Sequence, residues 1–287
     1  MTVSPDMQIT ELTVNDHACL TFGEAAELLD LTAAFIRDGL LAGLKVVWVT
    51  DLARARVVSE LAGRGIAVEP ALSAGQLAPV GWEDGLLGEQ GFAVDRAVGW
   101  LTSQMQACRD DGRPGLLVAV DMGWALRPVP GVEQLAEFEK GIAAVLPGTA
   151  ASVLCQYDRE RFDPVTLASV AGWHTHSMAA ATYHVDALLR ICRQYAPPGI
   201  RLAGELDFQA EEPLALALAE AIRLPGDLTV NMTELRFIDV CCARVITTAA
   251  RTLAVPRKAV LRCSPGVERV FRLLGATEIP GVSLVSV

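Results

Sequence analysis

Along this chain, short apolar runs typical of strands alternate with longer segments whose apolar positions have the spacing of amphipathic helices. Runs such as 45–50 (KVVWVT) and 115–121 (GLLVAVD) are apolar almost throughout, which is typical of parallel strands buried on both faces. We predict strands at residues 17–22, 45–50, 76–82, 115–121 and 151–156, and helices at 24–42, 52–64, 92–111, 132–146 and 164–172. This α/β alternation predicts a parallel sheet with helices on both faces.

The pattern changes near residue 184. Two strand-like runs, 187–193 and 200–206, are joined by Tyr195-Ala-Pro-Pro-Gly199, which favours a hairpin turn over a helical crossover. The later pattern predicts helices at 211–223, 240–253 and 266–274, and strands at 228–232, 259–262 and 282–285. We therefore expect two domains, residues 12–178 and 184–287, with a short mobile lead at 1–15 and a hinge at 177–186.

Length and charge agree with two domains and exclude some partners. The chain has 287 residues and a formal net charge of −10; residues 1–183 carry 12 bases and 23 acids, whereas 184–287 carry 12 bases and 11 acids. Nucleic-acid binding is disfavoured, because it requires a basic face. The apolar runs are far shorter than the roughly 20 residues that cross a bilayer, and no secretory signal is recognisable at the start. We expect a cytoplasmic protein without membrane contact.

The seven cysteines, at 19, 108, 155, 192, 241, 242 and 263, are odd in number, irregularly spaced and without a CxxC pair. This spacing fits neither a disulfide framework nor a compact zinc finger, and it favours free thiols. A phosphate-binding loop is also absent from the sequence, since none of the three lysines lies in a G-x-x-x-x-G-K-[ST] frame. A P-loop nucleotidase is therefore disfavoured.

Histidine, cysteine and acidic residues recur at the ends of the predicted strands. His17 and Cys19 are two apart on a strand and so share a face, while Cys155 lies near the carboxyl end of another strand. Asp121 ends the most apolar strand and is followed by Trp124, and His174 and His176 lie close to the end of the first domain. A shared pocket for a metal or a small polar ligand is one interpretation; scattered packing residues are the other.

Three motifs carry a resemblance over residues 12–178. They are Asp16-His-Ala-Cys-Leu20, Asp121-Met-Gly-Trp-Ala-Leu126 and Cys155-Gln-Tyr-Asp-Arg-Glu-Arg-Phe162, followed by Thr175-His176. In this order they resemble the MEDS domain, a sensory domain also found in a dichloromethane-responsive regulator. The resemblance implies a RecA-like fold lacking a P-loop, and sensing of small hydrocarbon derivatives through a His and a Cys. The ligand-binding candidates are His17, Cys19, Asp121, Trp124, Cys155, Tyr157 and His176, of which His17, Cys155 and His176 are also the metal candidates.

The second half resembles a STAS domain, the fold of anti-sigma-factor antagonists. The resemblance rests on Ile200-Arg-Leu-Ala-Gly-Glu-Leu-Asp207, Leu235-Arg-Phe-Ile-Asp239 and Pro265-Gly-Val-Glu-Arg-Val-Phe-Arg-Leu-Leu-Gly275. It implies a small α/β domain that docks the helix start after Phe-Ile-Asp against a partner kinase. Phosphorylation of a serine there would add about two negative charges and break the contact.

The chain departs from this family at the phosphorylated position. The antagonists read Asp-Ser-Ser/Thr-Gly, whereas this chain reads Asp239-Val-Cys-Cys242, so Cys241 replaces the serine and a kinase switch there is in doubt. Asp239 is expected to cap the helix that follows. Cysteines at a helix start can also have a lowered thiol pKa, which leaves a redox role open.

These features predict a non-enzymatic regulator of bacterial signal transduction and transcription. A small-molecule or metal signal would bind the first domain, and the second would dock an anti-sigma factor or related kinase through Asp207, Asp239, Cys241 and Cys242. The alternatives are a metal- or thiol-dependent enzyme using His17, Cys155 and His176, and a nucleotide-binding protein without hydrolysis. No cofactor follows from the sequence, and a homodimer is expected only by analogy with RecA-like domains.

Overall fold

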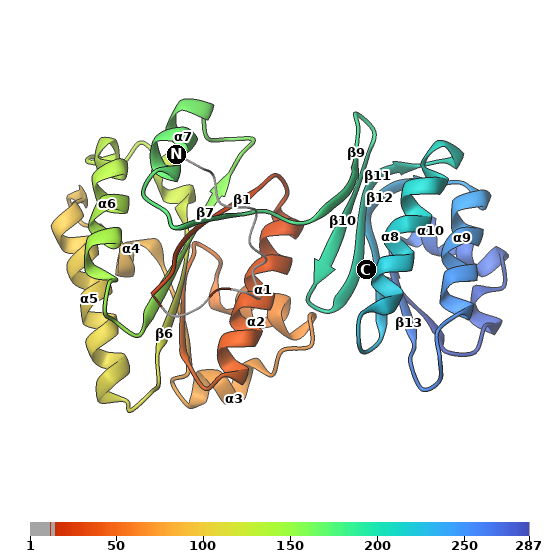
Figure 1. Ribbon diagram of the computed structural model, residues 1–287, viewed down its shortest axis with the longest axis horizontal. Coiled ribbons are helices and arrows are strands. Elements are labelled where there is room, and N and C mark those ends of the chain that lie inside the picture. Colours follow the sequence, from red (N-terminus) through yellow and green to blue (C-terminus); the bar gives the residue numbers. More distant parts are fainter. Residues whose placement is uncertain (1–11, 13–14, 287) are drawn as a thin grey trace. The chain divides into compact units, whose positions relative to one another are not determined.

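The computed structural model describes residues 12 and 15–286, so the predicted lead at 1–15 lies almost entirely outside the described residues. The chain divides into two compact units between Ala179 and Ala180. Each unit contains its own sheet, shown in Figure 1. Within the described ranges, no helix is both long enough and apolar enough to cross a membrane.

The first unit contains a six-stranded sheet in the order β3-β2-β6-β7-β1-β8, and every neighbouring pair is parallel. Two further strands of two residues each, β4 and β5, pair with each other outside this sheet. The strands are β1 (His17–Phe22), β2 (Lys45–Val49), β3 (Leu77–Val80), β4 (Leu87–Gly88), β5 (Gly91–Phe92), β6 (Leu116–Asp121), β7 (Ala151–Asp158) and β8 (His176–Met178). The parallel sheet predicted from the apolar runs is confirmed.

Helices cover both faces of this sheet. In Figure 1, α1 and α2 lie on one face and α5 and α6 on the other. The helices are α1 (Ala25–Leu41), α2 (Arg54–Ala62), α3 (Val68–Ser73), α4 (Trp82–Gly85), α5 (Val94–Asp110), α6 (Leu135–Val145) and α7 (Pro164–Ala171), with 3-10 turns at Met122–Leu126 and Val132–Gln134. The two shortest, α3 and α4, were not predicted, because six residues or fewer carry too little periodicity to be seen in the sequence.

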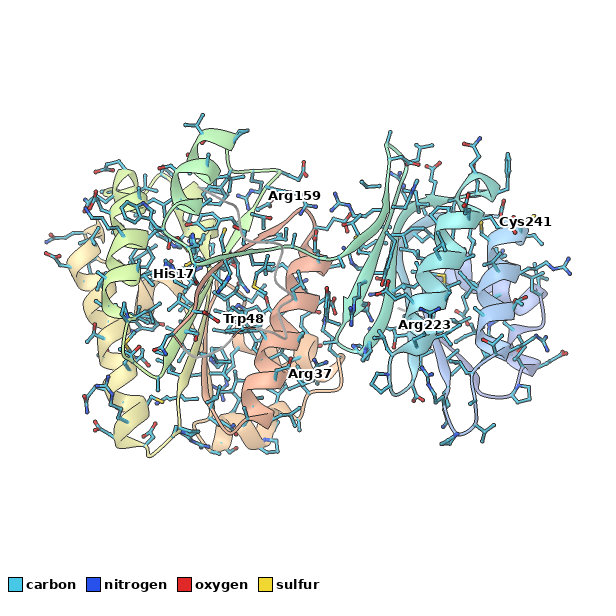
Figure 2. The ribbon with its side chains drawn as sticks, in the orientation of Figure 1. His17, Arg37, Trp48, Arg159, Arg223 and Cys241 are labelled. Carbon is cyan, nitrogen blue, oxygen red and sulfur yellow. The ribbon has the colours of Figure 1, made fainter. Side chains whose placement is uncertain are left out.

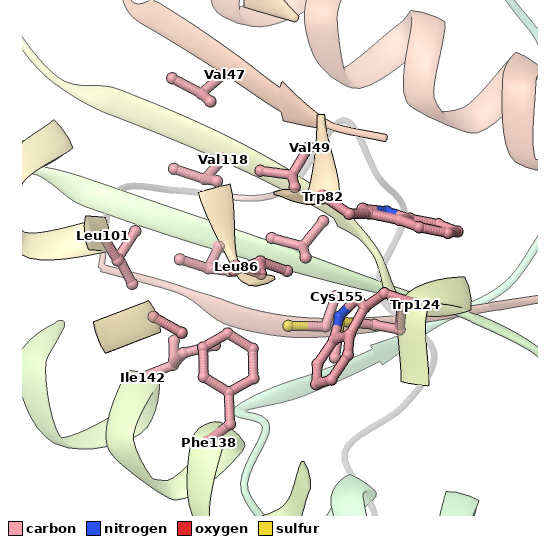
Figure 3. Close-up of a cluster of buried hydrophobic side chains, with 14 of the residues drawn as sticks. Val47, Val49, Trp82, Leu86, Leu101, Val118, Trp124, Phe138, Ile142 and Cys155 are labelled. Carbon is pink, nitrogen blue, oxygen red and sulfur yellow. The ribbon is translucent and has the colours of Figure 1, made fainter. Parts of the chain in front are cut away.

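The core under α5 and α6 explains why the strands are apolar throughout. Val118 and Val120 of β6 point into this core beside Leu101 of α5, as Figure 3 shows for Val118 and Leu101. The intervening Ala119 is also fully buried, because the opposite face of β6 is covered as well.

The second unit contains a mixed six-stranded sheet in the order β14-β13-β12-β11-β10-β9. Strands β9, β10 and β11 are antiparallel neighbours, so the hairpin predicted around 195–199 is confirmed, and β11 to β14 are parallel. Its elements are β9 (Thr182–Val185), β10 (Leu189–Tyr195), β11 (Pro198–Leu206), η4 (Phe208–Ala210), α8 (Glu211–Arg223), β12 (Leu228–Ile238), α9 (Val240–Arg251), β13 (Ala259–Cys263), α10 (Pro265–Leu273), η5 (Ala276–Glu278) and β14 (Val282–Ser286). The three helices pack on one face of the sheet (Figure 1).

The expected hinge at 177–186 is not a free linker. Ser177 and Met178 belong to β8, which pairs with β1, while Thr182–Val185 forms β9, which pairs with β10. Short edge strands satisfy backbone groups in both parts of this segment, and within it only residues 179–181 and Asp186 lie outside the two sheets. The prediction missed these strands because they are brief and partly polar.

Candidate functional site

Two neighbouring strands position the residues that the sequence analysis ranked highest. Strands β1 and β7 run parallel with Cys19 opposite Cys155, which places His17 at the start of β1 close to the middle of β7. The His17 Nε2 atom lies 3.6 Å from the Cys155 Sγ atom. Figure 2 shows His17 in the interior of the first unit. The structure therefore brings together the imidazole and the thiol that the family resemblance singled out.

Glu139 of α6 is the centre of this group. Its Oε2 atom lies 3.0 Å from His17 Nε2 and 3.4 Å from Cys155 Sγ. The Tyr157 hydroxyl donates a short hydrogen bond to the other carboxylate oxygen, Oε1. One carboxylate thus contacts β1 through His17 and β7 through Cys155 and Tyr157.

His174, between α7 and β8, completes the group. Its Nε2 atom lies 3.4 Å from Glu139 Oε2, and its ring centroid lies 4.2 Å from that of His17. The opposite nitrogens are held by main-chain carbonyls: His174 Nδ1 hydrogen-bonds to Val170 O at 2.9 Å and His17 Nδ1 to Trp173 O at 3.1 Å. The end of α7 and the segment after it thereby fix the orientation of both imidazoles.

The four side chains are shielded from solvent. Glu139 and Cys155 are fully buried, His17 is 2% exposed, and the side chain of His174 is 0% exposed. Burial, the negative charge of Glu139 and a hydrogen bond to it raise the pKa values of Cys155 and Tyr157 well above their usual ranges. Burial lowers the pKa of His17. Burial alone would raise the pKa of Glu139, but the two histidines outweigh it and hold that pKa well below its usual range.

This arrangement offers one nitrogen, oxygen or sulfur ligand atom from each of four residues. The ligand atoms of His17, Glu139, Cys155 and His174 all lie within 4.8 Å of one another. Imidazole nitrogen, thiolate sulfur and carboxylate oxygen are the groups that bind zinc in proteins. These four residues can therefore hold a metal ion together.

Two members of the group were not among the predicted site residues. Glu139 occupies the apolar stripe of α6 with Leu135, Phe138 and Ile142, and an acid at such a position was the signal that could have revealed it. His174 stood two residues from the candidate His176, and spacing could not choose between them. The structure places His176 outside the group, where its Nε2 atom lies 3.3 Å from Asp16 Oδ1.

Cys19 and Trp124 lie in the apolar core beside this group. Cys19 is buried in the same core as Cys155, and burial together with the charge of Glu139 raises its pKa to about 12. Trp124 stacks on Phe92 at a centroid distance of 4.3 Å, and Figure 3 shows it beside Cys155. Both side chains pack in the apolar core that also contains Cys155.

Asp121 has a local structural role at the end of β6. Its carboxylate accepts a hydrogen bond from Gly123 N at 2.9 Å and caps the 3-10 turn Met122–Leu126. Burial raises its pKa to about 6. No contact between Asp121 and the group of His17, Glu139, Cys155 and His174 is recorded in the described part of the chain.

A surface hollow of about 500 Å³ lies next to the buried group. One of its lining residues contacts the group and another contacts its partner Tyr157: the carbonyl of Val170 accepts the hydrogen bond from His174, and the ring of Phe162 packs edge-on against Tyr157 at 5.0 Å. The lining also contains Arg161 and Asp163 beside apolar residues. A small ligand in this hollow would be one side chain away from the group.

The predicted docking residues of the second unit lie around the starts of two helices. Asp207 caps η4 through Gln209 N at 3.0 Å, and Asp239 caps α9 through Cys242 N at 2.7 Å, which confirms the predicted cap. Cys241 is exposed and lines a groove of about 520 Å³ between α8 and α9.

Cys242 lies on the inner side of the same helix start. It is fully buried, and its Sγ atom donates to the carbonyl oxygen of Asp207 at 3.0 Å. Burial and the charge of Asp239 raise its pKa to about 12. The suggestion of a lowered thiol pKa is therefore wrong for Cys242, because the loss of hydration raises this pKa by more than the helix N-terminus lowers it.

Comparison with known proteins gives one family match. Residues 16–175, more than half of the chain, match the family described as MEDS, MEthanogen/methylotroph, DcmR Sensory domain. No curated protein matches the chain. All four residues of the buried group lie within the matched range.

Solved structures show a partial likeness. The chain is similar to a KaiC-like protein from the hyperthermophilic archaeon Pyrococcus horikoshii OT3, at 15% identity and a TM-score of 0.46 over 64% of this chain and 79% of that one. It is also similar to the flagellar accessory protein FlaH from Methanocaldococcus jannaschii, at 11% identity and a TM-score of 0.43 over 67% of this chain and 85% of that one.

Proposed function

Because this chain belongs to the MEDS family of sensory domains, we propose that its first unit receives a chemical signal and that its second unit reports the signal to a protein partner. The family indicates a signalling role. The nature of the signal, the reporting surface and the partner are the parts that we propose.

One observation carries the proposal: the buried group of His17, Glu139, Cys155 and His174 inside the family-matched range. Its members come from β1, α6, β7 and the segment after α7, which are distant in the sequence. A chemical change at Glu139 therefore alters the contacts of α6, two central strands and the end of α7 at once. Such a junction is suited to converting a local event into a shift between two packed arrangements.

The same geometry favours a receptor over a catalyst. A catalytic group must meet its substrate, whereas the side chains of Glu139, Cys155 and His174 are 0% exposed. The Cys155 thiol also has a raised pKa, which suppresses the nucleophilic thiolate. We therefore propose a non-enzymatic regulator rather than a thiol-dependent enzyme.

The hollow beside the group is the proposed entry point for a small molecule. Through Phe162 it adjoins Tyr157, and through Val170 it adjoins His174, so a molecule bound there presses on two partners of the group. The apolar part of its mixed lining suits small hydrocarbon derivatives, the class that the family is proposed to sense.

The second unit is proposed to act as a STAS-like docking module for an anti-sigma factor or related kinase. Phe208 and Val240 are exposed, and each directly follows an aspartate that caps a helix. The exposed Cys241 lies on the same helix start and cannot be phosphorylated on oxygen. Control by the first unit would then replace control by phosphorylation, and a tenfold change in partner affinity requires about 1.4 kcal/mol of coupling.

The test begins with thermal unfolding of the full chain followed by tryptophan fluorescence. All five tryptophans precede residue 179, so this signal reports the first unit alone. We expect dichloromethane or methanol, as one-carbon probes, to raise the melting temperature, because binding to the folded state stabilises it.

A matched pair of variants locates the effect. Ser169→Phe fills the hollow, whereas Ala168→Phe adds the same ring at an exposed position on α7 outside its lining. The shift should disappear in the first variant and persist in the second. The affinity of the full chain for an anti-sigma kinase should then depend on the probe; an affinity that never changes would remove the proposed coupling.

A further inference from the structure

The hydrogen-bond partners of the two histidines determine which nitrogens face Glu139. Main-chain carbonyls only accept hydrogen bonds, so the Nδ1 atoms of His17 and His174, which contact Trp173 O and Val170 O, are assigned the protons. In the neutral form that binds a metal, each imidazole turns its Nε2 lone pair towards Glu139 Oε2. Three electron-rich atoms thus converge within 3.0–3.4 Å, and the single thiol proton of Cys155 cannot serve all of them.

Four of the six distances between these ligand atoms are close to the edges of a coordination tetrahedron, and all six lie within 4.8 Å. Around a zinc ion, bond lengths of roughly 2.0–2.3 Å give nitrogen–oxygen edges of about 3.3 Å and sulfur–oxygen and sulfur–nitrogen edges of about 3.5 Å. The corresponding distances here are 3.0 and 3.4 Å for the two nitrogen–oxygen pairs, 3.4 Å for sulfur–oxygen and 3.6 Å for sulfur–nitrogen.

We propose that His17 Nε2, His174 Nε2, Cys155 Sγ and a carboxylate oxygen of Glu139 bind one zinc-class divalent cation in a closed tetrahedral site. The inference rests on the proposed function, since it names the chemical class that the receiving site takes.

The charges of such a site balance without help from solvent. Binding releases the Cys155 thiol proton to water, and the carboxylate and the thiolate then neutralise the two charges of the cation. This neutrality matters because a net charge in a fully buried site is costly. With all four positions filled by protein atoms, the geometry is that of a structural or metal-responsive site, since catalytic zinc keeps one position open.

The hydrogen bonds that the four ligand residues make to other groups are also those usual around a protein-bound metal. Metal-bound histidines usually donate their second N–H to a carbonyl or carboxylate, as both do here through Nδ1. Ligating carboxylates are usually hydrogen-bonded in turn, and Tyr157 donates to the Oε1 atom of Glu139. These partners orient the ligands and fix the tautomers before any cation arrives.

The experiment uses the full chain, stripped with a chelator and titrated with Zn²⁺ or Co²⁺. We expect about one metal per chain by elemental analysis and release of at least one proton per metal, because the thiol must ionise. The Co²⁺ form should show the intense ligand-field bands of tetrahedral cobalt and a thiolate-to-cobalt charge-transfer band.

Variants assign the ligands. Cys155→Ser should abolish the charge-transfer band, and His174→Gln should weaken binding by at least tenfold. Cys108→Ser, another buried thiol of the same core, and His176→Gln, the neighbouring histidine, should behave as the wild type. Proton release by the wild-type chain keeps the test decisive if a ligand variant fails to fold.

Three results would overturn the site: no metal retained by the wild type, cobalt spectra without a thiolate band, or unchanged binding in both ligand variants. Metal binding is measured without a partner, so failure of the metal site can be told apart from failure of the proposed function. Metal bound with no effect of chelation or probe on partner affinity would refute the signalling role alone. Partner affinity that responds to a one-carbon probe in a chain that binds no metal would refute the metal site alone.

Discussion

The imidazole of His17 and the carboxylate of Glu139 face each other across 3.0 Å in the interior of the first unit. His17 opens β1 and Glu139 lies on the inner face of α6, so this contact joins the sheet to a helix packed upon it. Cys155, His174 and Tyr157 share the same carboxylate. The stability and the chemistry of the first unit therefore depend on one acidic side chain.

Removal of that carboxylate should strongly destabilise the first unit. Glu139→Ala deprives His17, His174 and Tyr157 of their shared buried partner, and loss of one member of a buried pair costs about 3–5 kcal/mol. Urea unfolding followed by tryptophan fluorescence measures the change. Glu137→Ala, an exposed acid on the same helix, is the control and should stay within about 0.5 kcal/mol of the wild type. Equal effects of the two variants would mean that the carboxylate is not the centre of the group.

The Tyr157 hydroxyl should matter through its single hydrogen bond. Tyr157→Phe keeps the ring packed on Phe162 but leaves the Oε1 atom of Glu139 without its donor, which costs about 1–3 kcal/mol of unfolding free energy. If the metal site is occupied, the same variant should lower metal affinity by ~10–100-fold. Tyr195→Phe in the second unit is the matched control for the fluorescence-detected transition. A Tyr157→Phe chain as stable as the wild type would contradict the structure.

Asp121 should make the stability of the first unit depend on pH. Its pKa is raised from the usual 3.8 to about 6, chiefly by burial, with the charges of Asp51 and Asp158 adding to the rise and Arg161 opposing it. The folded state therefore holds more protons than the unfolded state between these values, so this contribution is complete below about pH 3.8 and is lost as pH rises through about 6.

Asp121→Asn isolates this contribution. The amide oxygen still accepts from Gly123 N but carries no charge to desolvate. The variant should gain stability over the wild type as pH rises from 4 to 7, levelling at about 3 kcal/mol, since each unit of the shift from 3.8 to about 6 corresponds to roughly 1.4 kcal/mol. Unfolding free energies of both chains are measured at pH 4, 5, 6, 7 and 8 and subtracted. The other titrating groups are the same in both chains, so their contributions cancel in the difference. A difference independent of pH would refute the assignment.

One thiol of the native chain should react with iodoacetamide. Cys241 is exposed, whereas the other six cysteines are buried. Brief alkylation at neutral pH should add one group, at Cys241 by peptide mapping, and alkylation in denaturant should add seven. Cys241→Ala should remove the native reaction and leave the fold unchanged. Rapid native labelling of Cys155 or Cys242 would show that the interior around them opens readily.

Most strands were predictable because the residue types within each short run indicate by themselves that the run is buried. Residues 46–49 and 116–120 are apolar at every position, and this pattern indicates a sheet covered on both faces. The hairpin at 195–199 was equally local. By contrast, β8 and β9 owe their existence to the strands they pair with, since a run of three or four partly polar residues carries no pattern of its own.

The sequence by itself determined the alternation of strands and helices and the change of pattern near residue 184, because both depend on residue types at short spacing. It made His17 and Cys155 candidates through the motifs that carry the family resemblance. Only the tertiary structure decided that Glu139 joins them, and that His174 rather than His176 does so. A buried carboxylate on a helix looks from the sequence like one more polar position. Its partners are chosen by how α6 and the end of α7 pack against the sheet, and that packing is set by contacts between residues more than a hundred positions apart.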